Sequence, residues 1–198
     1  MKLVLATQNP KKLKEMNEIL RHLGVEVVSE AGLGVRIEVE ETGETFTDNA
    51  RLKATAVMQA TGLPAVADDS GLCVDALNGG PGVYSARFGG EGLDDKGRYT
   101  LLLEMLRGQT DRAAHFHTSI VCAFPNGDEL VCEGECPGTI AFAPMGEGGF
   151  GYDPVFFVPE LRKTFGQLTA EEKASVSHRG KALRAFAAAL DDYLKGNE

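Results

Sequence analysis

A short apolar run followed by two adjacent aspartates constrains the fold of this chain more than any other stretch. Residues 63–67 are apolar and suit a buried strand, and Asp68 and Asp69 follow them directly. Open α/β sheets collect their ligands at the carboxyl ends of strands. Successive strand residues point to opposite faces, so only one of the two carboxylates can face a given pocket. The run therefore predicts an α/β sheet with a functional carboxylate at a strand end, although Asp-Asp-Ser-Gly also suits a simple turn.

Strand-like and helix-like segments alternate along the rest of the chain. Thr45 and Asp48 have the spacing of a capping box at the start of one helix, and Gly24 is placed to end another. Asn126-Gly127 lies between two strand-like segments and is a strong hairpin signal, which predicts an antiparallel pair. Strands are expected at residues 2–6, 25–28, 63–67, 71–77, 114–124 and 129–136, and helices at residues 10–22, 46–60, 98–107 and 178–194.

Length and composition indicate one globular domain over residues 1–198. A chain of 198 residues can form a single core or one domain with two lobes and a cleft. No apolar run approaches the ~20 residues of a membrane helix, and the first residues do not resemble a secretory signal. We therefore expect a cytoplasmic protein with no membrane partner. The net charge of −9 opposes binding to a nucleic acid polymer but leaves room for a small anionic ligand.

The cysteines are expected to be buried free thiols. They are few and lie in apolar or strand-like contexts, which favours reduced side chains over disulfides. Cys132 and Cys136 are spaced like a pair of metal ligands, and His115 and His117 lie nearby in the sequence. No second close pair of cysteines completes a familiar zinc site, so zinc is not expected.

The first strand-to-helix junction has the features of a phosphate site. Unsatisfied N–H groups and the positive end of the helix dipole favour an anion there, and Lys12 lies one turn into the helix. The simpler alternative is a plain N-cap by Asn9 with Pro10 at the first helical position. The junction comprises Thr7, Gln8, Asn9, Pro10, Lys11 and Lys12, and Thr7, Asn9 and Lys12 could supply side-chain donors to a phosphate.

An acidic segment near residue 40 is a candidate metal site. Glu40, Glu41 and Glu44 form the densest group of carboxylates, and most such groups are solvated loops. A Mg²⁺ ion needs only one or two carboxylates together with substrate phosphates. Glu40 and Asp69 would make such a pair if their segments converge, which sequence spacing alone does not establish.

Two segments near the C-terminus are candidates for binding a flat ligand. The glycines of residues 146–151 allow close approach of the backbone, Phe150 or Tyr152 could stack on a base, and Asp153 could accept hydrogen bonds from ring nitrogens. The alternative is a loop whose aromatic rings fill the core. The second segment is rich in hydrogen-bond donors that could grip carbonyl or phosphate oxygens, or simply be solvated; it comprises Lys173, Ser177, His178 and Arg179.

Taken together, the motifs resemble the inosine triphosphate pyrophosphatase family, whose bacterial members hydrolyse non-canonical purine nucleotides. The resemblance runs in order from the first strand to the last helix and so covers nearly the whole chain. Gln8, Pro10 and Lys11 fall at places where members of that family vary. The motifs are Thr7-x-Asn9-x-x-Lys12, Ala67-Asp68-Asp69-Ser70-Gly71-Leu72, Pro81-Gly82-Val83-Tyr84-Ser85-Ala86-Arg87, Gly149-Phe150-Gly151-Tyr152-Asp153-Pro154 and Ser177-His178-Arg179.

The resemblance implies a fold, a reaction and a set of roles. The fold would be α/β, with an elongated mixed β-sheet flanked by helices and two lobes with a central cleft, in a homodimer. The reaction would be Mg²⁺-dependent hydrolysis of dITP, ITP and XTP to the monophosphate and pyrophosphate. Asp69 would be the proton acceptor and a metal ligand, with Glu40 the second metal carboxylate. Thr7, Gln8, Asn9, Pro10, Lys11, Lys12 and Ser70 would hold the phosphates and sugar, while Phe150, Gly151, Tyr152, Asp153, Lys173, His178 and Arg179 would enclose the base; Arg87 receives no role.

Three other readings compete with this one. A phosphatase of the haloacid dehalogenase type needs Asp-x-Asp-Gly, whereas here the aspartates are adjacent and Ser70 follows them. A Maf-like pyrophosphatase would have similar chemistry and act on other bases. A non-catalytic nucleotide sensor would bind the nucleotide without releasing pyrophosphate, and the intact set of acid, lysine and base-side residues opposes it.

Overall fold

The computed structural model describes residues 1–196, and within them seven strands form one mixed sheet in the order β2-β1-β3-β4-β5-β6-β7. Strand β1 pairs in parallel with β2 and β3, whereas β6 pairs antiparallel with β5 and β7. The predicted α/β class with a mixed sheet flanked by helices is confirmed. The strands are β1 (Lys2–Leu5), β2 (Glu26–Ser29), β3 (Ala65–Val74), β4 (Ala113–Ala123), β5 (Glu129–Ile140), β6 (Phe156–Val158) and β7 (Lys163–Thr164); the α-helices are α1 (Pro10–Leu20), α2 (Phe46–Thr61), α3 (Asp95–Met105), α4 (Ala170–Val176) and α5 (His178–Gly196).

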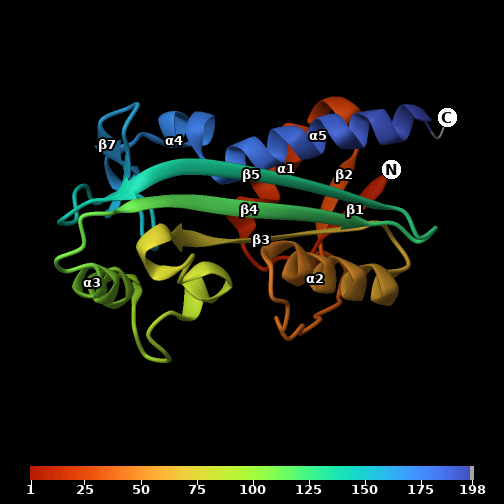
Figure 1. The fold of residues 1–198 in the computed structure, drawn as a ribbon. Helices are drawn as coiled ribbons and strands as arrows, with labels where there is room; N and C mark the ends of the chain where they lie inside the picture. The colour runs from red at the N-terminus through yellow and green to blue at the C-terminus, as the bar shows by residue number, and fades with distance from the viewer. Residues whose placement is uncertain (197–198) are drawn as a thin grey trace. The chain divides into compact units, whose positions relative to one another are not determined.

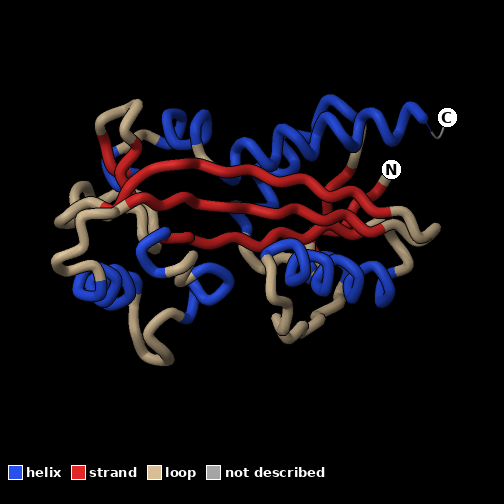
Figure 2. The backbone as a smooth tube through the Cα atoms, in the orientation of Figure 1, coloured by secondary structure: helices blue, strands red, loops and turns tan. Residues whose placement is uncertain are grey.

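Two compact units divide the chain, and each is assembled from separate segments. Unit 1 contains residues 1–69, 118–134 and the described residues from 181 onward, and unit 2 contains residues 70–117 and 135–180. Strands β3, β4 and β5, the long strands in Figure 2, contribute residues to both units. A single domain over residues 1–198, an elongated shape and a cleft between lobes stay predictions.

Unit 1 has helices on both faces of its strands. Helices α1 and α5 cover one face and α2 covers the other (Figure 1). On the first face, Met16 and Leu20 of α1 and Phe186 of α5 pack with β1 and β2 in one buried cluster. On the second face, small residues of α2 such as Ala50 and Ala54 allow the helix to approach β3 and β4 closely. Both helix faces are therefore fixed by apolar burial, which positions their polar residues.

Unit 2 has an aromatic core. The rings of Phe116, Phe156 and Phe165 contact one another, with centroid separations of 4.7 to 5.6 Å. The imidazole of His178 stacks on Phe116 at 4.7 Å, so this predicted site residue is held against the core. The first turn of α5 is thereby fixed within unit 2.

Several local predictions are confirmed. Thr45 and Asp48 form the capping box of α2, and Gly24 adopts the left-handed conformation at φ 65°. All four cysteines are free thiols; three are buried and Cys73 is partly exposed. Among the described residues, no helix combines the length and the apolar character needed to cross a bilayer.

Other boundaries differ from the predictions. Helix α1 ends at Leu20, where a short 3-10 turn replaces its last predicted residues. Helix α3 begins at Asp95 rather than residue 98, because Asp94 supplies an N-cap that accepts a hydrogen bond from Gly97 N. In the hairpin between β4 and β5, Gly127 has φ 93° whereas Asn126 does not have a positive φ.

The predicted strand end after residue 67 is wrong. Strand β3 continues through Asp68 and Asp69 to Val74, so both carboxylates lie in the middle of a ten-residue strand. Strand β1 pairs with β3 only at Ala65 and Val66, so beyond these residues β4 is the neighbouring strand that holds the backbone of β3 extended. The turn interpretation of Asp-Asp-Ser-Gly is excluded by the same observation.

Candidate functional site

Strand β3 directs its adjacent aspartates to opposite faces of the strands in unit 1. Asp68 hydrogen-bonds a lysine of α1, and Asp69 contacts residues of α2. This alternation is the period-2 geometry of an extended chain. The two carboxylates therefore have separate partners, as the sequence predicted.

On the α1 face, Lys12 and Asp68 form a short ion pair. Lys12 Nζ lies 2.7 Å from Asp68 Oδ2, and the side chain of Asp68 is 2% exposed while that of Lys12 is 31% exposed. A buried carboxylate is costly without a partner, so this pair stabilises unit 1 and orients the ammonium group. The remaining donors of Lys12 lie at the first turn of α1, where an anion is favoured.

The junction before α1 contains the N-cap that the sequence predicted, and this cap is compatible with a phosphate site at the same place. Asn9 is the N-cap, with Oδ1 accepting a hydrogen bond from Lys11 N at 2.9 Å, and Pro10 lies in the first turn. Thr7 Oγ1 accepts from Asn9 N at 3.2 Å, and Gln8 is exposed. The cap orders the loop, and the ordered loop presents the N-terminus of α1 beside the Lys12–Asp68 pair.

The same loop forms one wall of a cavity within unit 1. The cavity has a volume of about 450 Å³, and its lining also includes Glu30 and Arg36. Glu30 follows β2 and is itself 5% exposed. The cavity makes the side of the loop formed by Thr7, Gln8, Asn9 and Pro10 accessible to a small molecule.

On the α2 face, Asp69 contacts an amide and a lysine that the sequence analysis missed. Asn49 Nδ2 donates to Asp69 Oδ2 at 3.3 Å, and Lys53 Nζ lies 3.5 Å from Asp69 Oδ1 and 2.8 Å from Glu41 Oε1. Burial lowers the pKa of Lys53, but the neighbouring carboxylates outweigh it and hold the pKa above its ordinary value. The spacing of Asn49 and Lys53, four residues apart on one helix, could have indicated this shared face.

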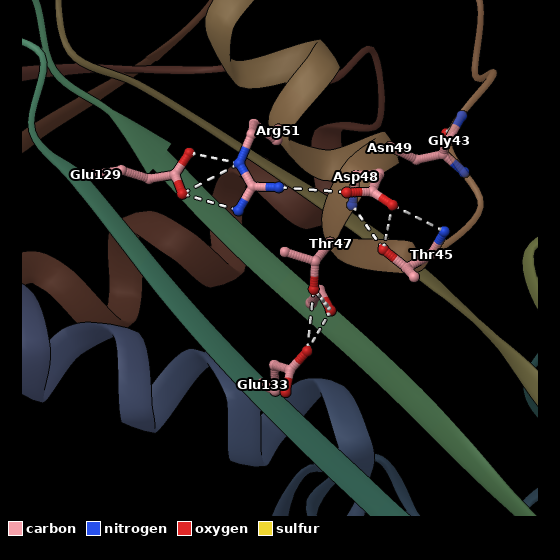
Figure 3. Close-up of polar contacts among 9 residues, drawn as sticks. Gly43, Thr45, Thr47, Asp48, Asn49, Arg51, Glu129 and Glu133 are labelled. Carbon is pink, nitrogen blue, oxygen red and sulfur yellow. Dashed lines mark hydrogen bonds and ion pairs between the residues drawn. The ribbon is translucent and has the colours of Figure 1, made fainter.

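Asn49 connects the acidic segment to Asp69. Its side chain is fully buried, and its Oδ1 accepts a hydrogen bond from Gly43 N at 2.8 Å. Figure 3 shows Asn49 lying against Gly43 at the start of α2. The Asn49 side chain therefore makes two contacts. Its oxygen holds the backbone that follows the acidic segment, and its nitrogen holds the Asp69 carboxylate.

If Mg²⁺ binds near Lys53, the carboxylates there would coordinate it together with substrate phosphates rather than alone. In the part of the chain that the structure describes, no three His, Cys, Asp or Glu side chains are grouped closely enough to hold a metal ion. Mg²⁺ commonly takes one or two carboxylates and completes its shell with substrate phosphates and water. Asp69 and Glu41 both contact Lys53, so two carboxylates lie near one another on this face. Glu40 is exposed just before Glu41, and its role as a ligand stays a prediction.

Replacing Gly43 should loosen this arrangement. A Cβ at Gly43 would lie 2.6 Å from Asp48 Cβ and 2.7 Å from Asn49 Oδ1. We expect Gly43→Ala to lower the free energy of unfolding by about 1–3 kcal/mol, because backbone and a buried amide must shift. Urea denaturation measures the change. Gly196→Ala is the control, since a Cβ there would meet no atom within 4 Å apart from its chain neighbours and the backbone of its own helix, and equal stability of the two variants would contradict the packing described.

A second polar network fastens α2 to the neighbouring strands. Arg51 makes a bidentate contact with Glu129 of β5, its nitrogens lying 2.9 Å from the two carboxylate oxygens, and also reaches Asp48 (Figure 3). Thr47 Oγ1 donates to Glu133 Oε1 at 3.0 Å. These contacts fix the helix that carries Asn49 and Lys53.

In unit 2, the candidate base-binding residues gather around Lys173. Its ammonium hydrogen-bonds Asp153 Oδ2 and lies 4.7 Å from the ring centroid of Phe150. Burial raises the pKa of Asp153, which is 3% exposed, and Lys173 opposes that shift without cancelling it. The ring of Phe150 is the exposed part of this group, at 77% for the residue. Phe150 is therefore the side chain available to stack on a flat ligand.

Tyr152 has a core role instead. The residue is 5% exposed, and its hydroxyl donates to the carbonyl of Ser85 at 2.8 Å. Of the two aromatic residues proposed to stack on a base, the structure leaves Tyr152 filling the interior, as the alternative interpretation of this loop held.

The start of α5 lies on the same aromatic core. Ser177 Oγ accepts a hydrogen bond from Gly180 N at 3.1 Å, as its predicted capping role requires. Phe165 connects the two groups, because Lys173 lies 5.3 Å from its centroid and the His178 ring is stacked at 6.3 Å. Unit 2 thus brings Phe150, Asp153, Lys173 and His178 together, with Arg179 following in sequence.

Two further residues from the motifs are placed but gain no new role. Ser70 is exposed on β3, immediately after Asp69. The guanidinium of Arg87 lies 5.0 Å from the ring centroid of Tyr84, which is itself exposed. Nothing in these contacts indicates a function for Arg87.

Comparison with known proteins gives matches over nearly the full length. A model described as the Ham1 family matches residues 3–189. A dITP/XTP pyrophosphatase from Exiguobacterium is 50% identical over 196 residues, which cover 99% of this chain and 100% of that protein. A dITP/XTP pyrophosphatase from Desulforamulus reducens is 54% identical over 186 residues, covering 93% of this chain and 92% of that protein.

Solved structures agree with these matches. A HAM1 protein from Coxiella burnetii has a TM-score of 0.93 and 43% identity, over 97% of this chain and 99% of that one. The Ham1 protein of Staphylococcus aureus has a TM-score of 0.91 and 40% identity, over 100% of both chains. The similarity therefore extends through both units.

Proposed function

This chain belongs to the Ham1 family, and from that relation we propose that it is a nucleoside-triphosphate pyrophosphatase. It hydrolyses dITP, ITP and XTP to the monophosphate and pyrophosphate and so removes non-canonical purines from the nucleotide pool. The observation that carries the proposal is the Asp69 carboxylate, oriented by Asn49 and Lys53, in a chain half identical to dITP/XTP pyrophosphatases over its length.

We propose Asp69 as the proton acceptor. Hydrolysis joins a water oxygen to the α-phosphorus and breaks the bond from that phosphorus to the oxygen that leaves with pyrophosphate. The proton released by the water passes to the Asp69 carboxylate. Asn49 and Lys53 each contact one oxygen of that carboxylate, which fixes its direction and limits the reorganisation needed during proton transfer.

The α1 junction is proposed to bind the triphosphate. Lys12 supplies a positive charge beside the N–H groups of the helix N-terminus, and both favour phosphate oxygens. Asp68 keeps the Lys12 side chain in place from the opposite side. Asp69 and Glu40 would hold Mg²⁺, with Glu41 close by, and when bound the ion supplies charge that neutralises the phosphate oxygens of the leaving pyrophosphate.

The unit 2 cluster is proposed to select the base. The exposed ring of Phe150 stacks on the purine, and Lys173 with Asp153 supplies a paired donor and acceptor. His178 and Arg179 direct donors toward the 6-oxygen of hypoxanthine or xanthine. Adenine carries an amino donor at that position, which would leave those donors unpaired and cost affinity.

The remaining proposals concern the state of the protein in the cell. We propose a cytoplasmic homodimer, on the family resemblance. Size-exclusion chromatography with light scattering tests the dimer.

A panel of nucleoside triphosphates tests the proposed reaction. The purified protein with Mg²⁺ is incubated separately with dITP, ITP, XTP, dATP, dGTP and dTTP, and products are identified by anion-exchange chromatography. Monophosphate plus pyrophosphate from dITP, ITP and XTP supports the proposal. Stepwise orthophosphate would contradict it, and pyrophosphate release chiefly from the other bases would favour the Maf-like alternative. Binding without any turnover would favour the sensor.

A further inference from the structure

The backbone between Phe150 and Asp153 is held by a side chain from another element of unit 2. Gly151 N donates to Asp95 Oδ2 at 2.7 Å, and Asp95 is the first residue of α3. The preceding residue, Asp94, already caps this helix by accepting from Gly97 N at 2.7 Å. Asp95 is therefore not needed to cap α3, and its side chain instead accepts a hydrogen bond from a residue outside that helix.

The segment it contacts is a tight turn. Phe150 N donates to Asp153 Oδ2 at 2.8 Å, and Asp153 N donates to the Phe150 carbonyl at 3.2 Å. Gly149 and Gly151 have φ of 81° and 60°, and a Cβ at Gly149 would lie 1.9 Å from Asp153 Oδ2. These bonds close the two ends of the turn, and Asp95 fixes the N–H at its centre.

We propose that Asp95 is a positioning residue for recognition of the purine base. It acts through the turn of residues 149–153, which carries Phe150 and Asp153, and the inference rests on the function proposed above. Phe150 is 77% exposed, so apart from the contact with Lys173 little packing fixes its ring, and the backbone beneath helps to hold it. A turn ordered before binding loses less conformational entropy when the base arrives.

The negative charge of Asp95 also affects the pKa of Asp153. Burial raises the pKa of Asp153 most strongly, Lys173 lowers it, and Asp95 adds a smaller upward contribution. A test must therefore separate the hydrogen bond from the charge. Asp95→Asn keeps an acceptor oxygen and removes the charge, whereas Asp95→Ala removes both.

The experiment measures steady-state hydrolysis of dITP and affinity for inosine monophosphate. We expect Asp95→Ala to raise KM and the dissociation constant roughly five- to tenfold while kcat changes less than about twofold, since binding of the base is weakened before the chemical step. Asp95→Asn should recover most of the loss. Asp94→Asn is the matched control, because it removes a charge from the adjacent position and keeps a good N-cap, and it should behave as wild type.

Hydrogen exchange supplies a readout that does not depend on turnover. We expect the Gly151 amide to exchange faster in Asp95→Ala than in wild type or Asp94→Asn. Wild-type KM in Asp95→Ala, or an equal rise in Asp94→Asn, would overturn the inference and leave the proposed function standing. Failure of the wild type itself to cleave dITP and bind the monophosphate would instead overturn the proposed function, and this inference with it.

Discussion

Asp69→Asn is expected to lower kcat for dITP by about 10³-fold, because the amide cannot accept the proton that the attacking water releases. The substitution keeps the size of the side chain, and its one oxygen can still accept from Asn49, while Lys53 loses this partner and keeps Glu41. We therefore expect a folded protein whose melting temperature is close to that of the wild type. Single-turnover measurement with excess enzyme isolates the chemical step from product release.

The control for Asp69→Asn is Asp75→Asn. Asp75 is exposed just after β3, so its replacement removes the same charge without touching the candidate site. We expect wild-type turnover from this control. If Asp69→Asn retained turnover near that of Asp75→Asn with Mg²⁺ present, Asp69 would not be the proton acceptor.

Lys12→Met is expected to damage both stability and activity. It leaves the Asp68 carboxylate buried without its cation, which should lower the free energy of unfolding. Because Lys12 is partly exposed, we expect a decrease of about 2–3 kcal/mol, less than the full cost of breaking a buried ion pair. It also removes the charge proposed to bind phosphate, so we expect kcat/KM for dITP to fall by about 10²-fold. Urea denaturation and initial-rate kinetics measure the two effects.

A second variant separates the two roles of Lys12. In Lys12→Met with Asp68→Asn the buried charge is removed as well, so stability should return toward that of the wild type while activity stays low. Recovery of activity together with stability would mean that Lys12 has only a structural role. An unchanged stability in Lys12→Met would contradict the buried ion pair.

Local signals predicted much of unit 1 correctly. Two of these signals are the capping box at Thr45 and Asp48 and the helix-ending Gly24. Each depends on only a few neighbouring residues, so it can be predicted from the sequence alone. The alternation along β3 also held, and it correctly predicted that Asp68 and Asp69 have different partners. These features depend on the periodicity of one chain segment and on no distant contact.

The continuity of β3 could not be predicted in the same way. Asp-Asp-Ser-Gly has the composition of a turn, and only its pairing with the distant strand β4 holds it extended. The lysines that accompany the two aspartates lie 56 and 16 residues away in the sequence. A strand that carries two carboxylates is stable because those distant cations are present, and local composition gives no sign of them.

The missed residues share one cause. Asn49, Lys53 and Asp95 are polar residues near helix starts or on helix faces, where sequence analysis treats such side chains as caps or solvated groups. Asn49 is instead fully buried, and Asp95 bonds a backbone N–H 56 residues away. Their roles arise from which elements pack together, and a pattern within one helix does not specify that.

In the proposed reaction, water attacks the α-phosphorus and pyrophosphate leaves intact. Hydrolysis of dITP in water enriched in ¹⁸O, with the products analysed by mass spectrometry, tests it most directly. We expect one ¹⁸O atom in the deoxyinosine monophosphate and none in the pyrophosphate. Label in the pyrophosphate, or release of labelled orthophosphate, would contradict it.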